Sequence, residues 1–286
     1  MEAKTPDPVE FRQRQRQQWN SAAMGWRRWS ELIDRAASGV SGRLVELAGV
    51  ERGSRVLDVA AGYGEPSLTV AKKVGAEGSV VATDISPEML AYGRERAATA
   101  GIENIEFVES DAASLGFPEH SFDAALSRWG IIFEPDGEAA AARVRSFLEP
   151  GGRLAISSWG PPDRVPFLGI PMRTAMQCLQ VPPPPPGTPG PLSRPTPEAL
   201  GGLLEVAGFS AVEVEETEVT FEWESPEQFT TFVKEIAPPV TAMLAPHPQE
   251  VQEETWAAIT EATRGAAAAD GTVSFSNLAL LASGRA

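Results

Sequence analysis

Residues 56–71 read VLDVAAGYGEPSLTVA, and this stretch decides the fold. It begins as a short apolar segment of the kind that forms a buried strand. An acid, small residues and the alternating glycines Gly62 and Gly64 follow, and the chain then takes on a helical pattern. Such a turn lets a ligand approach bare backbone, because no side chain blocks it. The stretch predicts the first strand and ligand-binding turn of an α/β sheet, although a tight turn without a ligand remains the alternative for the stretch alone.

The chain on either side alternates short apolar segments with helical patterns. After the first strand we predict parallel strands at residues 78–86, 105–112, 122–129 and 151–159. The helix over residues 86–101 has Ser86 as its N-cap, Pro87 in its first position and Gly101 at its end. Residues 211–223 and 271–286 are expected to form an antiparallel edge pair. This order is typical of a doubly wound, Rossmann-like sheet that is mostly parallel.

Three segments fall outside this alternation. Residues 1–40 carry three tryptophans at helical spacing, and we expect an amphipathic helical lid there. Residues 161–195 include VPPPPPGTPGP and are interpreted as a stiff Pro-rich surface connection. Residues 225–270 are interpreted as a helical cap insert, which we expect to close over the ligand together with the N-terminal lid. The core is then divided among residues 41–160, 196–224 and 271–286.

Acidic residues end three successive predicted strands. Asp58 lies in the first strand, Asp84 ends the second and Asp111 ends the third. Each alone could be a helix cap or a loop carboxylate. Because the carboxyl ends of parallel strands meet at one crevice, the three together favour a nucleoside site in which Asp84 accepts hydrogen bonds from a ribose. The motif Asp58-x-Ala60-x-Gly62-x-Gly64 differs from the G-x-G-x-x-G of dinucleotide-binding proteins.

The composition excludes several classes of protein. A net charge of −15 and a pI near 4.7 disfavour nucleic-acid binding. The single Cys178 cannot form an internal disulfide, and we find no signal-peptide pattern and no apolar run of membrane-spanning length. We therefore expect a cytoplasmic protein without a membrane span and predict no metal site. The oligomeric state cannot be predicted from these features.

The motifs taken together resemble a known family. VLDVAAGYGEPSLTVAKKVGAEGSVVATDISPEMLAYGRERA, VESDAASLGFPEHSFDAALSRWGIIF and LEPGGRLAISSW are similar, in order and spacing, to the motifs of class I S-adenosylmethionine-dependent methyltransferases. The similarity covers about residues 41–160 and is greatest to the ubiquinone/menaquinone C-methyltransferase branch. The resemblance implies a seven-stranded sheet with an antiparallel last strand, and S-adenosylmethionine as the cofactor.

The resemblance also implies roles for individual residues. The turn would line the methionine moiety, Asp84 would hold the ribose, and Ile85 and Met89 would contact the adenine, whose edge Asp111 and Ala112 would bind. Ser127, Arg128 and Trp129 would border the sulfonium. Tyr63 stands where the branch usually has threonine. The expected cofactor-binding residues are Ala60, Gly62, Tyr63, Gly64, Asp84, Ile85, Met89, Asp111, Ala112, Ser127, Arg128, Trp129 and Trp26.

The segments outside the core point to a small, rather hydrophobic acceptor, such as a quinone-like compound, a polyketide or a terpenoid. Their apolar side chains could line a pocket, although each could equally be part of a core: Trp19, Trp26, Trp29, Trp129, Trp159, Phe167, Met172, Met176, Phe229, Phe232 and Met243. His247 is a candidate general base, but no catalytic residue is assigned. The alternatives are a methyltransferase-like binding module without turnover and a methyltransferase of tRNA or protein.

Overall fold

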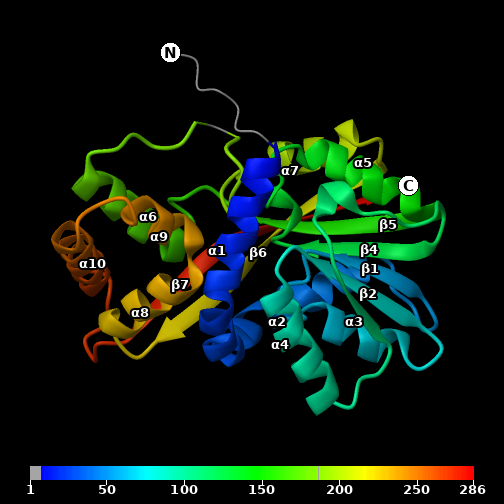
Figure 1. Ribbon diagram of the computed structural model, residues 1–286, viewed down its shortest axis with the longest axis horizontal. Coiled ribbons are helices and arrows are strands. Elements are labelled where there is room, and N and C mark those ends of the chain that lie inside the picture. The colour runs from blue at the N-terminus through cyan, green and yellow to red at the C-terminus, as the bar shows by residue number, and fades with distance from the viewer. Residues whose placement is uncertain (1–7, 186) are drawn as a thin grey trace.

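The computed structural model describes residues 8–185 and 187–286, and its centre is one seven-stranded sheet of order β3-β2-β1-β4-β5-β7-β6 (Figure 1). The strands among β1 to β5 pair in parallel, whereas β7 runs antiparallel to both β5 and β6. The predicted mostly parallel sheet with an antiparallel last strand is therefore confirmed. The strands are β1 (Arg55–Val59), β2 (Ser79–Asp84), β3 (Ile105–Glu109), β4 (Phe122–Arg128), β5 (Leu148–Trp159), β6 (Ser210–Trp223) and β7 (Val273–Arg285).

Helices cover both faces of the sheet. On one face α2 (Ser30–Leu47), α3 (Ser67–Val74) and α4 (Pro87–Thr99) share an apolar cluster with the sheet. On the other face lie α5 (Gly137–Phe147) and α7 (Pro197–Val206). Successive side chains of a strand point to opposite faces, so Val56 of β1 joins the first cluster and Leu57 the second. Strand order reverses between β1 and β4, and such a switch point places a crevice at the carboxyl ends of these strands.

The ends of α4 follow from its sequence. Ser86 accepts a hydrogen bond on its hydroxyl from the Met89 amide at 3.2 Å, and Pro87 occupies the first turn, where no amide hydrogen is needed. At the other end Gly101 takes a positive φ of 65°. The predicted start and end of this helix are confirmed, and its N-terminus is fixed beside the carboxyl end of β2.

A helical layer stands beyond the carboxyl end of β5. β5 pairs with β7 as far as Trp159 opposite Ala279, but β6 and β7 stay paired to Trp223 opposite Val273. The two long strands therefore extend past the sheet edge and carry helices there. Helix α1 crosses between this layer and the sheet (Figure 1). Helix α1 spans Pro8–Arg28, and the layer itself consists of α6 (Pro166–Leu179), α8 (Pro226–Ile236), α9 (Pro238–Leu244) and α10 (Gln249–Arg264).

The structure corrects two expectations about these segments. The N-terminal segment forms two helices, α1 and α2, which meet at Trp29. Within the expected Pro-rich loop, residues 166–179 form α6, because Pro166 occupies the first turn and the burial of Phe167 and Leu168 outweighs the loss of one amide donor at Pro171. Residues 1–7 of the expected lid lie outside the described residues. No helix in the described residues is long and apolar enough to cross a membrane.

Candidate active site

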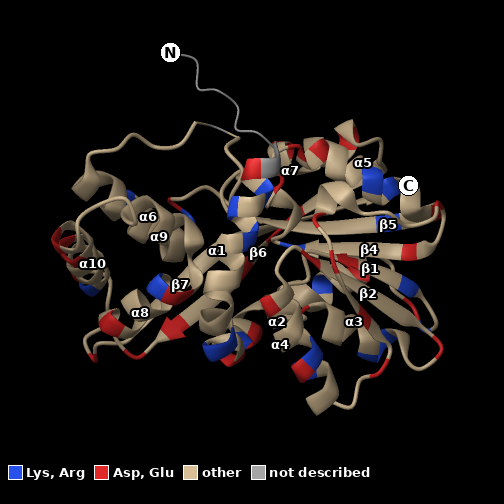
Figure 2. Cartoon of the chain, in the orientation of Figure 1, with Lys and Arg blue, Asp and Glu red and all other residues tan. Residues whose placement is uncertain are grey.

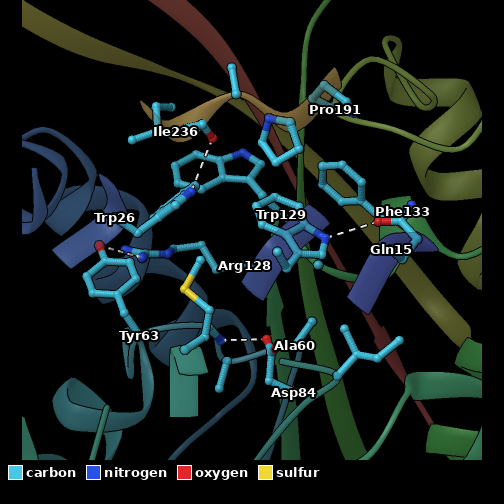
Figure 3. A pocket seen from close by; sticks show the side chains of 18 of the residues that line it. Gln15, Trp26, Ala60, Tyr63, Asp84, Arg128, Trp129, Phe133, Pro191 and Ile236 are labelled. Carbon is cyan, nitrogen blue, oxygen red and sulfur yellow. Dashed lines mark hydrogen bonds between the residues drawn. The ribbon is translucent and has the colours of Figure 1, made fainter. Parts of the chain in front are cut away.

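A cavity of about 180 Å³ lies at the carboxyl ends of β1 to β4, walled by α1 on one side and by the connection from α8 to α9 on another (Figure 3). One part is lined by the turn after β1 and by the acidic side chains that follow β2 and β3. The other part is lined mainly by aromatic side chains of α1, β4, β5 and the helical layer. The topology therefore brings a polar half and an apolar half into one cavity.

The glycine turn after β1 presents backbone to the cavity. Ala60 and Gly62 have positive φ values of 57° and 54°, and the Gly62 amide donates a hydrogen bond to Asp84 Oδ2 at 2.8 Å. A Cβ placed on Gly62 would meet no atom within 4 Å, so this position faces open space. Asp58 lies fully buried beneath the turn and accepts a hydrogen bond from Ser67 Oγ at the start of α3. The turn is thus fixed from below and open above.

Asp84 is held rigidly at the end of β2. Its second oxygen accepts a hydrogen bond from the Ser86 amide at 2.8 Å, so both oxygens are oriented by backbone donors. Burial raises the pKa of Asp84 to about 6, although hydrogen bonds from the Ser86 and Gly62 amides act in the opposite direction. A carboxylate positioned in this way can still accept further hydrogen bonds from a ligand, since each oxygen has two lone pairs.

Asp111 also lines the polar half of the cavity. Its Oδ1 atom is buried and has no hydrogen-bond partner in the described residues, while its Oδ2 atom lies 3.9 Å from Arg12 Nε of α1. Burial, together with the negative charge of Asp111, raises the pKa of nearby Glu134 to about 7. A buried acceptor without a partner is costly, and a ligand N–H group that reached Asp111 would remove that cost.

A polar network, in part buried, ties the glycine turn to α2. The Tyr63 hydroxyl donates a hydrogen bond to Asp34 Oδ1 at 2.7 Å, and Arg96 forms an ion pair with the same carboxylate. The Arg128 guanidinium donates to the Tyr63 hydroxyl at 3.2 Å (Figure 3). It also donates to Ser41 Oγ of α2 at 2.9 Å. Burial raises the pKa of the Tyr63 phenol well above its ordinary value, so its hydroxyl stays protonated and can donate.

The apolar half is built on stacked aromatic rings. The Trp129 and Trp159 rings are 4.3 Å apart and nearly parallel, at 7°, and Phe167 packs edge-on against Trp159. Trp26 of α1 donates its indole N–H to the Ile236 carbonyl at 3.2 Å, which joins α1 to the end of α8. This half therefore offers flat apolar walls to a bound molecule.

Most of the expected cofactor-binding residues line this cavity. These are Ala60, Gly62, Tyr63, Asp84, Ile85, Met89, Asp111, Ala112, Arg128, Trp129 and Trp26. Gly64 does not, because it faces α4, where a Cβ would lie 3.3 Å from Gly93 Cα. Ser127 does not line it either: this side chain is fully buried and bonds the Val59 carbonyl and the Ile131 amide. Both residues shape the turn from behind.

The expected acceptor-pocket residues divide in the same way. Trp19, Trp26, Trp129, Trp159, Phe167 and Phe232 line the cavity, whereas Trp29, Met172, Met176, Phe229 and Met243 do not. His247 is not among the lining residues, nor is His120, which bonds the Leu148 carbonyl. The sequence reasoning missed Phe11, Gln15 and Glu134. The signal for the first two was the spacing Phe11, Gln15, Trp19, which places all three on one face of α1.

Comparisons with known proteins identify the core. Residues 56–152 match the family model described as a methyltransferase domain. This segment of the chain is therefore similar to a methyltransferase domain. Within it lie β1 to β4, the glycine turn, Asp84 and Asp111. The helices α1 and α2 precede the matched segment, and the elements from α6 to β7 follow it. These elements complete the sheet and the walls of the cavity.

Curated relatives are similar to the chain in sequence, and solved structures share its fold. Over 116 residues the chain is 40% identical to the aklanonic acid methyltransferase DauC of Streptomyces sp. strain C5, covering 41% of this chain and 53% of DauC. Over 138 residues it is 38% identical to the ubiquinone/menaquinone biosynthesis C-methyltransferase UbiE of Pseudomonas putida, covering 46% and 54%. The chain thus spans about half the length of these relatives. The [4+2]-cyclase SpnF shares the fold, with a TM-score of 0.54, 20% identity and coverage of 87% and 82%.

The residues of the methyltransferase domain fit S-adenosylmethionine. The open space above Gly62 leaves room for a ligand against the backbone. Asp84 presents a carboxylate that can accept hydrogen bonds from ribose hydroxyls, and the partnerless Oδ1 of Asp111 can accept one from an exocyclic amine. Ile85 and Met89 also line the cavity and supply apolar surface for a base.

We expect the substitution Asp84→Ala to weaken S-adenosylmethionine binding by about 1–3 kcal/mol, because the ribose hydroxyls lose a charged acceptor. Isothermal titration calorimetry measures this loss. Asp123→Ala is the matched control, since Asp123 accepts a hydrogen bond from the Arg55 amide at 2.7 Å but lies outside the cavity. An unchanged dissociation constant in folded Asp84→Ala protein would remove the ribose assignment.

Proposed function

We propose that the protein is an S-adenosylmethionine-dependent methyltransferase that transfers a methyl group to a small, rather hydrophobic acceptor, such as a quinone-like compound, a polyketide or a terpenoid. The observation that carries this proposal is the continuity of the cavity. Its polar half holds Gly62, Asp84 and Asp111, and its aromatic half begins at Trp129 and Trp159. A cofactor in the first half would place its reactive end toward a molecule in the second.

The chain's own contribution to the reaction is positioning. Bound S-adenosylmethionine supplies an activated methyl group on a sulfonium. The stacked rings of Trp129 and Trp159 orient a flat acceptor, and no histidine is among the described residues that line the cavity. Holding the reacting atoms at roughly 3–3.5 Å and excluding water are the contributions that such a site can make. The acceptor's nucleophilic atom must therefore be reactive without a histidine base beside it.

Helix α1 and the connection from α8 to α9 form the proposed lid. Trp26 of α1 bonds the Ile236 carbonyl, Trp29 donates to Glu235 Oε2 at 2.7 Å, and Arg28 pairs with the other oxygen of Glu235 at 2.9 Å. These contacts connect the two walls that cover the cavity. A lid made of two linked segments would open and close as one unit, and closure would keep water from the reacting atoms.

The names of the relatives support a small acceptor. DauC is named for aklanonic acid and UbiE for ubiquinone and menaquinone biosynthesis, so both names refer to small molecules. The cartoon in Figure 2 shows the basic residues scattered among acidic ones along the chain, and the net charge is −15, which offers little to a phosphate backbone. We therefore propose a small molecule, and not a tRNA or a protein, as the acceptor.

The decisive experiment measures turnover. The protein is incubated with S-adenosylmethionine and a panel of naphthoquinols, aromatic polyketide acids and terpenoid alcohols, and release of S-adenosylhomocysteine is followed. We expect release with at least one planar hydrophobic acceptor. Because SpnF, a [4+2]-cyclase, shares this fold, the fold alone does not set the reaction. Tight cofactor binding without release on any member of the panel would favour a binding module over a methyltransferase.

A further inference from the structure

Arg128 is a buried cation that lines the cavity without an ionic partner. Arg128 is the last residue of β4, and only 8% of its surface is exposed to solvent. In the structure its guanidinium forms two hydrogen bonds, and both go to the neutral hydroxyl oxygens of Ser41 and Tyr63. Within residues 8–185 and 187–286, no carboxylate lies within 4.0 Å of this guanidinium. A guanidinium has five N–H donors, so most of its donors remain available.

Asp34, the carboxylate of this hydrogen-bond network, already has two partners. Asp34 accepts the Tyr63 hydroxyl on one oxygen and pairs with Arg96 through the other. Arg96 therefore pairs with Asp34 directly, whereas Arg128 is linked to Asp34 only through the Tyr63 hydroxyl. The negative charge of Glu65 also acts on Arg128, but no ion pair within 4.0 Å joins the two side chains in the described residues. Burying a charge without a direct counterion is costly, so the guanidinium of Arg128 fits an anion supplied by a ligand.

From this geometry we infer that Arg128 binds the α-carboxylate of S-adenosylmethionine. The inference rests on the proposed function. Arg128 was expected to border the sulfonium, but a guanidinium would repel that positive charge, whereas the carboxylate stands at the opposite end of the amino-acid chain. Arg128 touches Tyr63 of the glycine turn, where the methionine moiety is expected. Glu65 of the same turn also lines the cavity and can receive the α-ammonium, so the two residues match both charges of an amino acid.

The test compares two nucleosides that differ only at this end of the cofactor. S-Adenosylhomocysteine carries the amino acid, and 5′-methylthioadenosine lacks it. For Arg128→Met we expect the affinity for S-adenosylhomocysteine to fall about 10- to 100-fold, while that for 5′-methylthioadenosine stays within twofold. Both dissociation constants are measured by calorimetry on the full chain, and circular dichroism reports the fold. Arg128→Lys, which keeps the charge but loses the two-pronged donor, is expected to lie between the wild type and Arg128→Met.

Arg94→Met provides the matched control, because Arg94 of α4 donates to the Phe107 carbonyl on the exposed surface, outside the cavity. It should bind both nucleosides as the wild type does. An equal loss for both nucleosides in Arg128→Met, or no loss for either, would overturn the carboxylate assignment while the wild type still binds cofactor. A wild-type protein that binds neither nucleoside would remove the proposed function as well, so the two failures are distinguishable.

Discussion

The substitution Gly62→Val is expected to abolish S-adenosylmethionine binding while the sheet stays folded. Gly62 has a φ of +54°, a conformation in which a β-branched side chain is strained, and its missing Cβ faces open cavity space. Valine would therefore occupy the space that the cofactor needs and disturb the amide that donates to Asp84. We expect an affinity loss of at least 100-fold, measured by calorimetry, with a far-ultraviolet circular dichroism spectrum close to that of the wild type.

The variant Gly101→Val separates the effect of backbone strain from the effect of a side chain that fills the cofactor's space. Gly101 has a similar φ of +65°, a Cβ there also meets no atom within 4 Å, and the residue lies at the end of α4, outside the cavity. Both variants should lose a comparable amount of thermal stability, but only Gly62→Val should lose the cofactor. Binding that survives in Gly62→Val would show that the turn does not contact the cofactor, whereas binding lost in both variants would point to strain alone.

The parts of the site that the sequence predicts are those fixed by local rules. Asp84 and Asp111 follow strands, and parallel strands end at one edge, so their convergence follows from topology. Ser86 and Gly101 set the ends of α4 through capping, which depends on neighbouring residues alone. Gly64 and Ser127 do not line the cavity, and the motif could not show this because it gives their position along the chain and not the direction that each faces.

The parts that the sequence does not predict depend on contacts across long separations. Asp34 and Ser41 meet Tyr63 and Arg128 only because α2 packs over the glycine turn, and no local pattern carries that information. The prolines around α6 favour a loop, but the packing of Phe167 against Trp159 and Phe221 stabilises the helix in spite of them. The contacts of α2 and the helix α6 therefore differ from the sequence-based expectation because tertiary packing overrides the conformational preference of the local sequence.

The second large effect is expected at Gly25, where α1 crosses α8. A Cβ at this position would lie 2.2 Å from the Glu235 carbonyl oxygen, so any side chain forces the two helices apart. Gly25→Leu should break the bonds of Trp26 to Ile236 and of Trp29 to Glu235, which join the two halves of the lid. We expect turnover to fall at least tenfold because water enters the site and the acceptor loses its wall.

Hydrogen exchange tests the lid independently of the acceptor. In the wild type, S-adenosylhomocysteine together with an acceptor from the panel should slow exchange in both residues 8–28 and residues 226–244. In Gly25→Leu the amides of both segments should exchange faster, and both segments should lose the protection that the ligands give, because each segment closes only against the other. The amides of β1 to β5 should keep the protection that they have in the wild type. Gly39→Leu is the control, since Gly39 lies on α2 with no atom within 4 Å of its Cβ position. Full turnover in Gly25→Leu, or wild-type protection of α1 in that variant, would show that α1 is a fixed structural helix. The half-buried Trp19 and Trp26 of α1, and Trp29 just after it, would then contribute by packing alone.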